Sequence, residues 1–284
     1  MLDVFVIGGA NLDIKARTIS AHVAETSNPA IIISKPGGVA RNIAHNLARL
    51  GAKVALQTVV GNDAAGHEIL AATAKAGCDV ASIMRVNMAT GTYLAILDDK
   101  GELATAVNDM RCLEALTIDA LDWPRILESR FIVADCNLGV DVLRALAAGC
   151  GDKLIVEPVS VSKCQKLRDV LPAHTIFAAT PNLDQLEALT TTRDIRSGIA
   201  ALHTLGLQNV VIHAGAHGAF VSDGKTITHI PAQANAIIDV TGAGDAATAG
   251  LIFGLTQNVP LAKAALIGQE MAAKVIASQF STLE

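Results

Sequence analysis

The chain has 284 residues, which is enough for one large α/β domain or two small ones. Charged residues make up 17% and the net charge is −5, so a surface that binds a nucleic acid polymer is not expected. No apolar run reaches the length of about 18 residues that a membrane-spanning helix needs, so no membrane partner is expected either.

The residue composition also bears on fold class and compartment. Hydrophobic residues make up 51% and aromatic residues only 3%, which suits parallel strands covered by helices on both faces. The five cysteines are scattered and include no C-x-x-C pair, which predicts reduced, mostly buried thiols. The chain opens on a strand-like run at residues 4–7, so no signal peptide is expected and the predicted location is cytoplasmic.

The first predicted strand, at residues 4–7, ends in two glycines and is followed by Asn11 and Asp13. Polar groups just beyond the carboxyl end of a buried strand lie where open α/β sheets bind ligands. An Asx turn is the other interpretation of these two residues. Residues 15–35 have weak helical periodicity and end in a β-branched run, which predicts a loop and a strand outside the main domain.

Gly37 and Gly38 precede a predicted amphipathic helix that contains Asn42 and closes at Gly51. Two glycines at a helix start let a ligand approach the backbone closely. Arg41, in the first turn, is interpreted as an exposed helix residue, with neutralisation of a phosphate as the alternative. Residues 52–60 continue the series as a strand.

A β-hairpin is predicted next, with strands at residues 92–97 and 103–107 around a turn at 98–101. Because a hairpin does not fit a series of alternating strands and helices, we expect it to form a small separate sheet with residues 15–35. From residue 131 onward the alternation is regular. Strands are predicted at residues 131–134, 154–156, 175–179, 210–213 and 219–221, and helices near 145, 168, 187, 200, 250 and 270.

The most informative segment is residues 239–245, Asp-Val-Thr-Gly-Ala-Gly-Asp, followed by an apolar run that predicts a helix. The glycines let backbone N–H groups approach an anion, and the start of the helix adds a partial positive charge. Asp245 lies where the turn meets the helix, a suitable place for a general base beside a phosphoryl group. A helix start capped by Thr241 or Asp245 is the alternative.

Residues 239–245 resemble the D-T-x-G-A-G-D motif of the ribokinase-like (PfkB) carbohydrate kinases, and Gly37-Gly38 with Asn42 resembles that family's first motif. The resemblance implies that Gly242, Ala243 and Gly244 form an anion hole for the transferred phosphate and that Asp245 deprotonates the acceptor hydroxyl. It further implies that the sugar is held by a set of polar and glycine residues near the N-terminus: Asn11, Asp13, Gly37, Gly38 and Asn42.

The same resemblance implies a three-layer α/β/α domain with a mostly parallel central sheet and a small β-sheet lid. The lid would comprise residues 15–35 and 91–107, and the core residues 1–14, 36–90 and 108–284. A lid that excludes water fits phosphoryl transfer, since water would otherwise hydrolyse ATP. The family also implies a homodimer formed through the lid.

Several further segments resemble the pseudouridine kinases, a nucleoside-specific branch of this family: residues 108–110, 133–137, 156–160 and 163–164. A C-linked uracil offers N–H donors and carbonyl acceptors, which Asn side chains can match. Asn108 and Asn137 are therefore the candidates for base recognition, with a turn residue and a helix cap, respectively, as the alternatives. Lys163 either pairs with a ligand oxygen or is a solvated helix lysine.

On the nucleotide side, the resemblance implies ATP binding by Asn182, Gly215, Gly218, Thr241 and Gly244. The family's N-x-x-E motif, which organises Mg²⁺, is altered here because Gln185 stands at its last position. Glu187 or the neighbouring Asp184 would then act through water, or Mg²⁺ would be held by the ATP phosphates. Asp239 matches a residue near a monovalent-cation site, so K⁺ is a further expectation.

These residues together predict an ATP- and Mg²⁺-dependent kinase of the 5′-hydroxyl of pseudouridine. One alternative is another ribokinase-like kinase, acting on ribose or adenosine. A second alternative is a non-catalytic nucleoside-binding protein on the same fold, which Gln185 favours and Asp245 disfavours.

Overall fold

The computed structural model describes residues 1–233, 237–278 and 281–284. Its main sheet has eight strands in the order β14-β13-β12-β11-β10-β9-β1-β4. All pairings from β12 to β4 are parallel, whereas β13 and β14 are antiparallel. The strands are β1 Val4–Ile7, β4 Val54–Gln57, β9 Phe131–Asp135, β10 Leu154–Glu157, β11 Ile176–Ala179, β12 Leu207–His213, β13 Ala219–Ser222 and β14 Ile227–Ile230.

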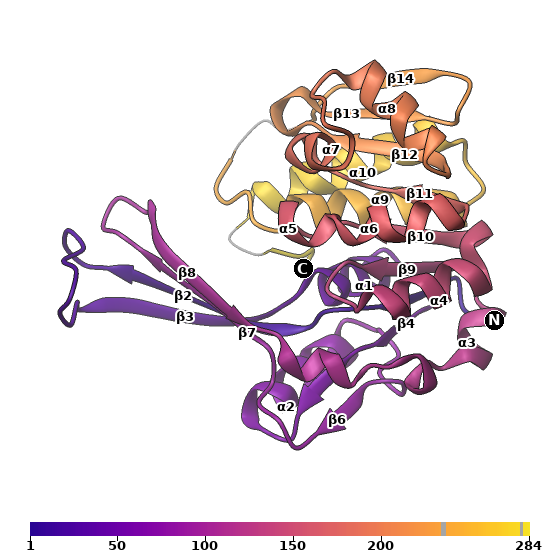
Figure 1. Ribbon diagram of the computed structural model, residues 1–284. Coiled ribbons are helices and arrows are strands. Elements are labelled where there is room, and N and C mark those ends of the chain that lie inside the picture. The colour runs from indigo at the N-terminus through magenta and orange to yellow at the C-terminus, as the bar shows by residue number, and fades with distance from the viewer. Residues whose placement is uncertain (234–236, 279–280) are drawn as a thin grey trace.

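Helices cover both faces of this sheet (Figure 1). The α-helices of the described residues are α1 Val39–Arg49, α2 Ala64–Lys75, α3 Trp123–Glu128, α4 Val140–Cys150, α5 Val161–Cys164, α6 Lys166–Val170, α7 Leu183–Thr190, α8 Ile195–Thr204, α9 Ala243–Thr256 and α10 Leu261–Ile276, of which α2 packs on β2, β3 and β5 rather than on this sheet. In β1, Phe5 and Ile7 pack into one apolar cluster with α4, α6, α7 and α8, while Val4 and Val6 pack into another with α1 and α9. A strand buried on both faces is apolar throughout, as the composition predicted. The predicted three-layer architecture is confirmed.

The smaller sheet has the order β3-β2-β7-β8 and extends away from the core (Figure 1). Its strands are β2 Asn11–Thr18, β3 Ala30–Gly37, β7 Thr92–Leu97 and β8 Leu103–Asp109. The predicted hairpin is β7–β8, and Asp98 stabilises its turn by accepting from the amides of Lys100 and Glu102. Strand β2 begins at Asn11 and β3 ends at Gly37, so both strands extend beyond the predicted range of 15–35 and reach into the core.

One predicted strand is wrong, and one strand of the main sheet was not predicted. Residues 52–60 are not one strand: β4 ends at Gln57, and β5 Val59–Gly61 pairs with β6 Met84–Val86 in a separate two-stranded sheet. The apolar run continues through both strands, so hydrophobicity alone does not reveal the break. Strand β14, whose first three residues are exposed, was not predicted because it lacks an apolar run.

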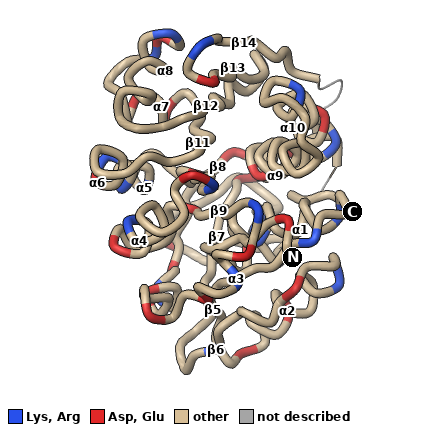
Figure 2. The backbone as a smooth tube through the Cα atoms, turned by 90° about the vertical axis from the view of Figure 1, so that its right-hand side faces the viewer, with Lys and Arg blue, Asp and Glu red and all other residues tan. Residues whose placement is uncertain are grey.

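The cysteines, the charged residues and the helix lengths can be compared with what the composition predicts. All five cysteines are free and buried, as predicted. Figure 2 shows Lys and Arg interspersed with Asp and Glu over the elements. In the part of the chain that the structure describes, no helix is both long and apolar enough to cross a membrane.

Candidate active site

The site lies at the carboxyl ends of β1, β9 and β10, where α1 and α9 begin. Asp135, the last residue of β9, is fully buried and joins these segments. Its carboxylate accepts hydrogen bonds from the amides of Gly9 (2.9 Å), Ala40 (3.0 Å) and Asn137 (2.9 Å), and from the Asn137 side chain (3.0 Å). Burial raises the pKa of Asp135. Its role as an organiser of the site was not predicted, since its partners are remote in sequence.

Asn11 and Asp13 lie in β2 rather than in an Asx turn, and the Asn11 amide donates to Asp13 Oδ1 at 2.6 Å. Gly37 lies opposite Asn11 in β3, and a Cβ at Gly37 would lie 2.1 Å from Asp13 Oδ2. Only glycine therefore lets this carboxylate lie against the backbone. Burial raises the pKa of Asp13, and the Asn11 hydrogen bond opposes this shift.

The N-cap residue of helix α1 is Gly38, which has φ 96° and provides no side-chain cap. Asp135 supplies the missing acceptor through its bond to Ala40 N. Arg41 was predicted to be exposed, but it is buried, with 3% exposure. Its guanidinium donates to Pro36 O (3.1 Å) and Asn42 Oδ1 (3.3 Å), and burial lowers its pKa to about 10. Arg41 thus orients the Asn42 amide.

The turn before α9 has Gly242 as its N-cap, with φ 80° and no side-chain cap, so neither Thr241 nor Asp245 caps the helix. Ala243 N donates to Val240 O at 3.3 Å. Among the described residues, none accepts from the amides of Gly242, Gly244 or Asp245. These N–H groups at a helix start form the anion-binding arrangement that the motif predicted.

Asp245 is half-buried, and its Oδ2 accepts from Asn42 Nδ2 at 2.8 Å. Burial raises the pKa of Asp245 to about 7; the nearby carboxylates of Asp135 and Asp13 add to the shift, and the Asn42 hydrogen bond opposes it. A carboxylate that titrates near neutrality is suited to accept a proton at physiological pH.

Sequence reasoning did not assign Glu157, the buried last residue of β10. Its Oε2 accepts from Val159 N at 2.7 Å. Burial raises its pKa well above the usual range, and the carboxylates of Asp245 and Asp135 raise it further. Val159 has φ 67°, an unfavourable backbone conformation for a β-branched residue, so this turn is locally strained.

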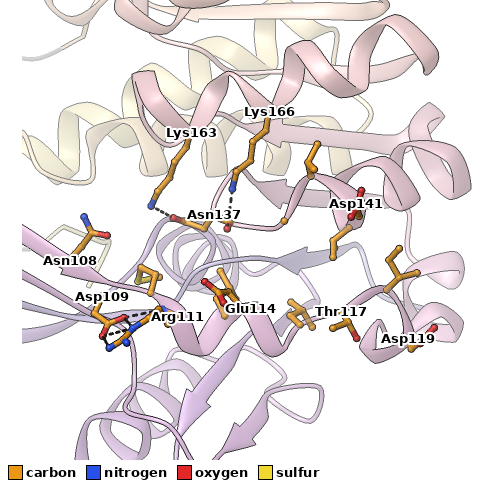
Figure 3. Close-up of a pocket in the computed structure, with 17 residues that line it drawn as sticks. Asn108, Asp109, Arg111, Glu114, Thr117, Asp119, Asn137, Asp141, Lys163 and Lys166 are labelled. Atoms are coloured by element: carbon orange, nitrogen blue, oxygen red, sulfur yellow. Dashed lines mark hydrogen bonds and ion pairs between the residues drawn. The ribbon is translucent and has the colours of Figure 1, made fainter.

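The lining of a cavity of about 1180 Å³ includes Asn108, Asn137 and Lys163 (Figure 3). Lys163 Nζ donates to Asn137 Oδ1 at 2.5 Å, so Lys163 is not a solvated lysine. Helix α4 is capped by Gly139, which excludes the helix-cap interpretation of Asn137. Asn108 lies within β8, not in a turn. Lys166 stabilises the loop between β9 and α4 by donating to Cys136 O and Leu138 O.

A separate cavity of about 450 Å³ borders the turn before α9 at Val240, Ala243 and Gly244. Its lining includes Asn182, Gly215, Gly218 and Gly244, four of the five predicted nucleotide residues. Thr241 faces a neighbouring cavity instead. None of the residues that the structure describes lies within 4 Å of where a Cβ on Gly244 would be, so this position is open to the cavity. Gln269, on α10, also lines the cavity and was not predicted.

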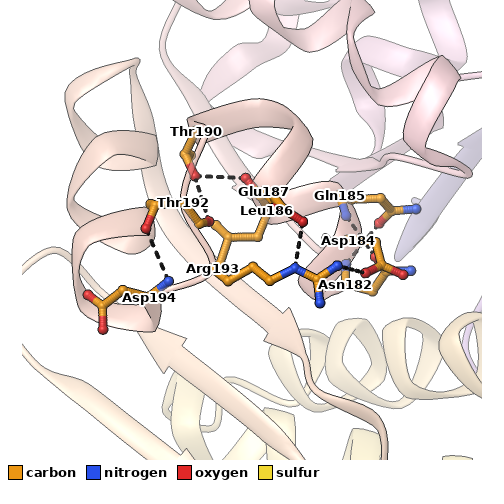
Figure 4. A network of polar contacts seen from close by, with 9 residues as sticks. All are labelled: Asn182, Asp184, Gln185, Leu186, Glu187, Thr190, Thr192, Arg193 and Asp194. Carbon is orange, nitrogen blue, oxygen red and sulfur yellow. Dashed lines mark hydrogen bonds and ion pairs between the residues drawn. The ribbon is translucent and has the colours of Figure 1, made fainter.

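Asn182 and Gln185 form a reciprocal capping box at the start of α7: Asn182 Oδ1 accepts from Gln185 N at 2.9 Å, and Gln185 Oε1 accepts from Asn182 N at 2.8 Å. Glu187 and Asp184 both bind Arg193, at 2.5 and 2.7 Å (Figure 4). In residues 1–233, 237–278 and 281–284, no group of three or more His, Cys, Asp or Glu side chains is arranged to hold a metal. Arg193 therefore competes with a metal ion for these two carboxylates.

Asp239, the candidate for a monovalent-cation site, receives a lysine ammonium. Lys15 Nζ, from β2, lies 3.0 Å from Asp239 Oδ2 and 3.0 Å from Thr241 Oγ1. Asp239 Oδ1 accepts from Thr241 N at 2.8 Å. Lys15 was not predicted as a site residue because it is separated from this turn by more than two hundred residues.

An open α/β sheet with an anion-binding helix start beside a carboxylate of pKa about 7 is an arrangement suited to phosphoryl transfer to a hydroxyl group. Residues 1–282 match the model of the pfkB family carbohydrate kinases, and the chain belongs to that family. It is therefore an enzyme of the sugar- and nucleoside-kinase class.

Known relatives span nearly the whole chain. Pseudouridine kinase of Escherichia coli is 34% identical over 98% of this chain and 91% of its own length. Guanosine-inosine kinase of Exiguobacterium acetylicum is 28% identical over 98% of this chain and 95% of its own. The structure of a carbohydrate kinase from Agrobacterium tumefaciens superposes with a TM-score of 0.84 at 29% identity, over 99% of this chain and 93% of that one.

Proposed function

We propose that this chain transfers the γ-phosphoryl group of ATP to the 5′-hydroxyl of pseudouridine. The observation that carries the proposal is the hydrogen bond between Asn42 and Asp245 beside amides that have no acceptor among the described residues. Phosphoryl transfer needs a base that accepts the hydroxyl proton and N–H donors that stabilise the developing charge. A carboxylate with a pKa of about 7 and a preformed set of amides supply these two functions. The pseudouridine kinase relative supports the choice of acceptor.

In the proposed reaction, the nucleoside 5′-oxygen forms a bond to the γ-phosphorus while the bond from that phosphorus to the β–γ bridging oxygen breaks. The 5′-hydroxyl proton passes to Asp245 Oδ, and ADP leaves. The amides of Gly242 and Gly244, with Ala243 between them, stabilise the charge that develops on the transferred group. The ribose is held by the side chains and glycines that β2, β3 and α1 bring together: Asn11, Asp13, Gly37, Gly38 and Asn42.

Base recognition is assigned to Asn137, with Asn108 from the lid strand. The Asn137 amide is fixed in one orientation, because its nitrogen donates to Asp135 and its oxygen accepts from Lys163. One N–H and one lone pair remain for a ligand, which matches one donor–acceptor edge of a uracil ring. The Lys163 ammonium has further N–H groups for a carbonyl oxygen of the same ring.

ATP is proposed to occupy the cavity lined by Asn182, Gly215 and Gly218, with its phosphates toward Gly244. Mg²⁺ is proposed to arrive as part of the MgATP substrate, held by phosphate oxygens, because Glu187 and Asp184 are engaged by Arg193. When bound, the ion neutralises phosphate charge. Five free cysteines suit a reducing compartment, and we place the proposed reaction in the cytoplasm.

The proposed function is tested by initial rates with MgATP and four acceptors: pseudouridine, uridine, ribose and adenosine. Pseudouridine is expected to exceed ribose and adenosine in kcat/KM by at least about tenfold, since an unmatched buried polar edge costs about 1–3 kcal/mol, and to exceed uridine if an Asn side chain meets the second ring N–H, which uridine lacks. The variant Asn137→Ala should lose this preference while retaining turnover of ribose. A preference for ribose or adenosine would instead favour another kinase of the family, and binding without turnover would favour a nucleoside-binding protein.

A further inference from the structure

A side chain of the lid sheet reaches the catalytic turn. Lys15, on β2, donates from one ammonium group to Asp239 Oδ2 and to Thr241 Oγ1, both at 3.0 Å. The other oxygen of Asp239 accepts from Thr241 N. The ammonium and the carboxylate therefore hold Thr241 by both its side chain and its backbone.

Thr241 directly precedes the turn whose amides face the proposed phosphate, so holding Thr241 restrains the start of that turn. Gly242, the next residue, has φ 80° and begins α9, and the amides of Gly242, Gly244 and Asp245 have no acceptor among the described residues. On its other side the turn is packed tightly: a Cβ on Gly242 would lie 2.1 Å from Ser281 O. The turn is thus held between the C-terminal segment and the lid, and Lys15 provides the polar contact on the lid side.

Lys15 is also linked to the substrate side of the site. Asp13 and Lys15 are two residues apart in β2, so their side chains share one face of the sheet. Both line a cavity of about 360 Å³ that is also bordered by Asp239 and Thr241. One strand of the lid therefore carries both a residue of the proposed ribose site, Asp13, and the cation that contacts the turn, Lys15.

We infer that Lys15 is a positioning residue for phosphoryl transfer, which couples the lid to the anion-binding turn by acting as a tethered cation on Asp239 and Thr241. This inference rests on the proposed function for its kinetic consequences, but not for its structural ones. It assigns the position beside Asp239 to a side chain of the protein rather than to a free monovalent cation, so wild-type turnover should not depend on K⁺.

The test compares Lys15→Met and Lys15→Arg with the matched control Arg17→Met. Arg17 lies on the same face of β2 and lines the same cavity, but its guanidinium donates to Asp99 O within the lid. Lys15→Met should lower kcat about tenfold or more with a smaller change in nucleoside KM, whereas Lys15→Arg should keep most of kcat. Methylammonium, ammonium or K⁺ should restore part of the activity of Lys15→Met, with no effect on wild type. Arg17→Met should stay within about twofold of wild type.

Hydrogen–deuterium exchange of the peptide that spans residues 239–245 gives a readout independent of activity. Lys15→Met should exchange faster there than wild type and Arg17→Met. If wild type phosphorylates no acceptor but this difference is seen, the proposed function fails and the inference about Lys15 stands. Unchanged exchange at the turn, or a Lys15→Met enzyme with normal kcat and no response to added cations, would overturn the inference.

Discussion

Asp245 sets the pH dependence of the proposed reaction. Burial and the neighbouring carboxylates raise its pKa to about 7, and only the ionised form accepts the proton of the hydroxyl. The value of kcat/KM should therefore rise about tenfold per pH unit below pH 7 and level off above it. Rates measured between about pH 5.5 and 9 test this expectation.

Asn42→Ala is the informative companion variant for this profile. The Asn42 amide donates to Asp245 and lowers its pKa, so its removal should move the rising limb to higher pH. A profile that is flat through pH 7 in the wild type, or one that Asn42→Ala leaves in place, would contradict the assignment of Asp245 as the base.

Individual residues differ in how far the sequence reveals them. The glycines and Asp245 of residues 239–245 are recognisable because a backbone anion site needs those residue types in that order. The burial of Arg41 was not predicted, since its acceptors are a proline carbonyl, the Asn42 side chain and residues of α1 and α2, which only the fold brings around it. The organising role of Asp135 was not predicted for the same reason: Gly9 and Ala40, which donate to it, are remote in sequence.

At the scale of elements, features fixed by local turn residues were predicted, whereas features fixed by pairing between distant strands were not. The β7–β8 hairpin was predicted because its turn, residues 98–101, is rich in turn-forming residues. The break between β4 and β5 depends on pairing with β1 and β6, which no local pattern contains. The departure at Gln185 also has a local explanation: a glutamine there closes the capping box of α7 with Asn182.

The lid sheet carries a further proposal, a homodimer formed through its exposed apolar side chains. Ile31, Ile32 and Ile33 of β3 are 64%, 68% and 52% exposed. Successive residues of a strand point to opposite faces, so this edge strand exposes large apolar side chains on both of its faces, which is costly in water and is typical of an interface. Wild type is expected to sediment as a dimer, and Ile32→Lys, which would bury a charge, should weaken the dimer about 100-fold or more.

The control for the dimer is Leu127→Lys, which alters an exposed leucine on α3, outside the lid. It should remain dimeric. If wild type is monomeric at micromolar concentration, or if both variants dissociate equally, the lid is not the interface.

At the scale of the whole molecule, the site joins segments that the chain order keeps far apart. The carboxyl ends of parallel strands meet at one edge of the sheet, so Gly9, Asp135 and Glu157 converge there, and the starts of α1 and α9 close over them. The family motifs predicted the site residues at the starts of α1 and α9, because each motif is local, but they did not assign Asp135 or Glu157. The contacts between motifs, such as Asn42 with Asp245 or Lys15 with Asp239, required the fold.

The central claim is that this chain phosphorylates pseudouridine with Asp245 as the base. The most direct test follows formation of pseudouridine 5′-phosphate from MgATP, by mass spectrometry, in wild type and Asp245→Asn, together with calorimetric binding of pseudouridine to both. Wild type should form the monophosphate, and Asp245→Asn should lose about 10²–10⁴-fold in rate while still binding the nucleoside.

Stability provides the control for that comparison. The folded protein raises the pKa of Asp245 from 3.8 to about 7, so this carboxyl stabilises the fold less as the pH rises through that window. Asp245→Asn should therefore unfold at no lower temperature than wild type at pH 8, and a loss of rate there reports chemistry. Near-normal product formation by Asp245→Asn, or no monophosphate from wild type, would contradict the account.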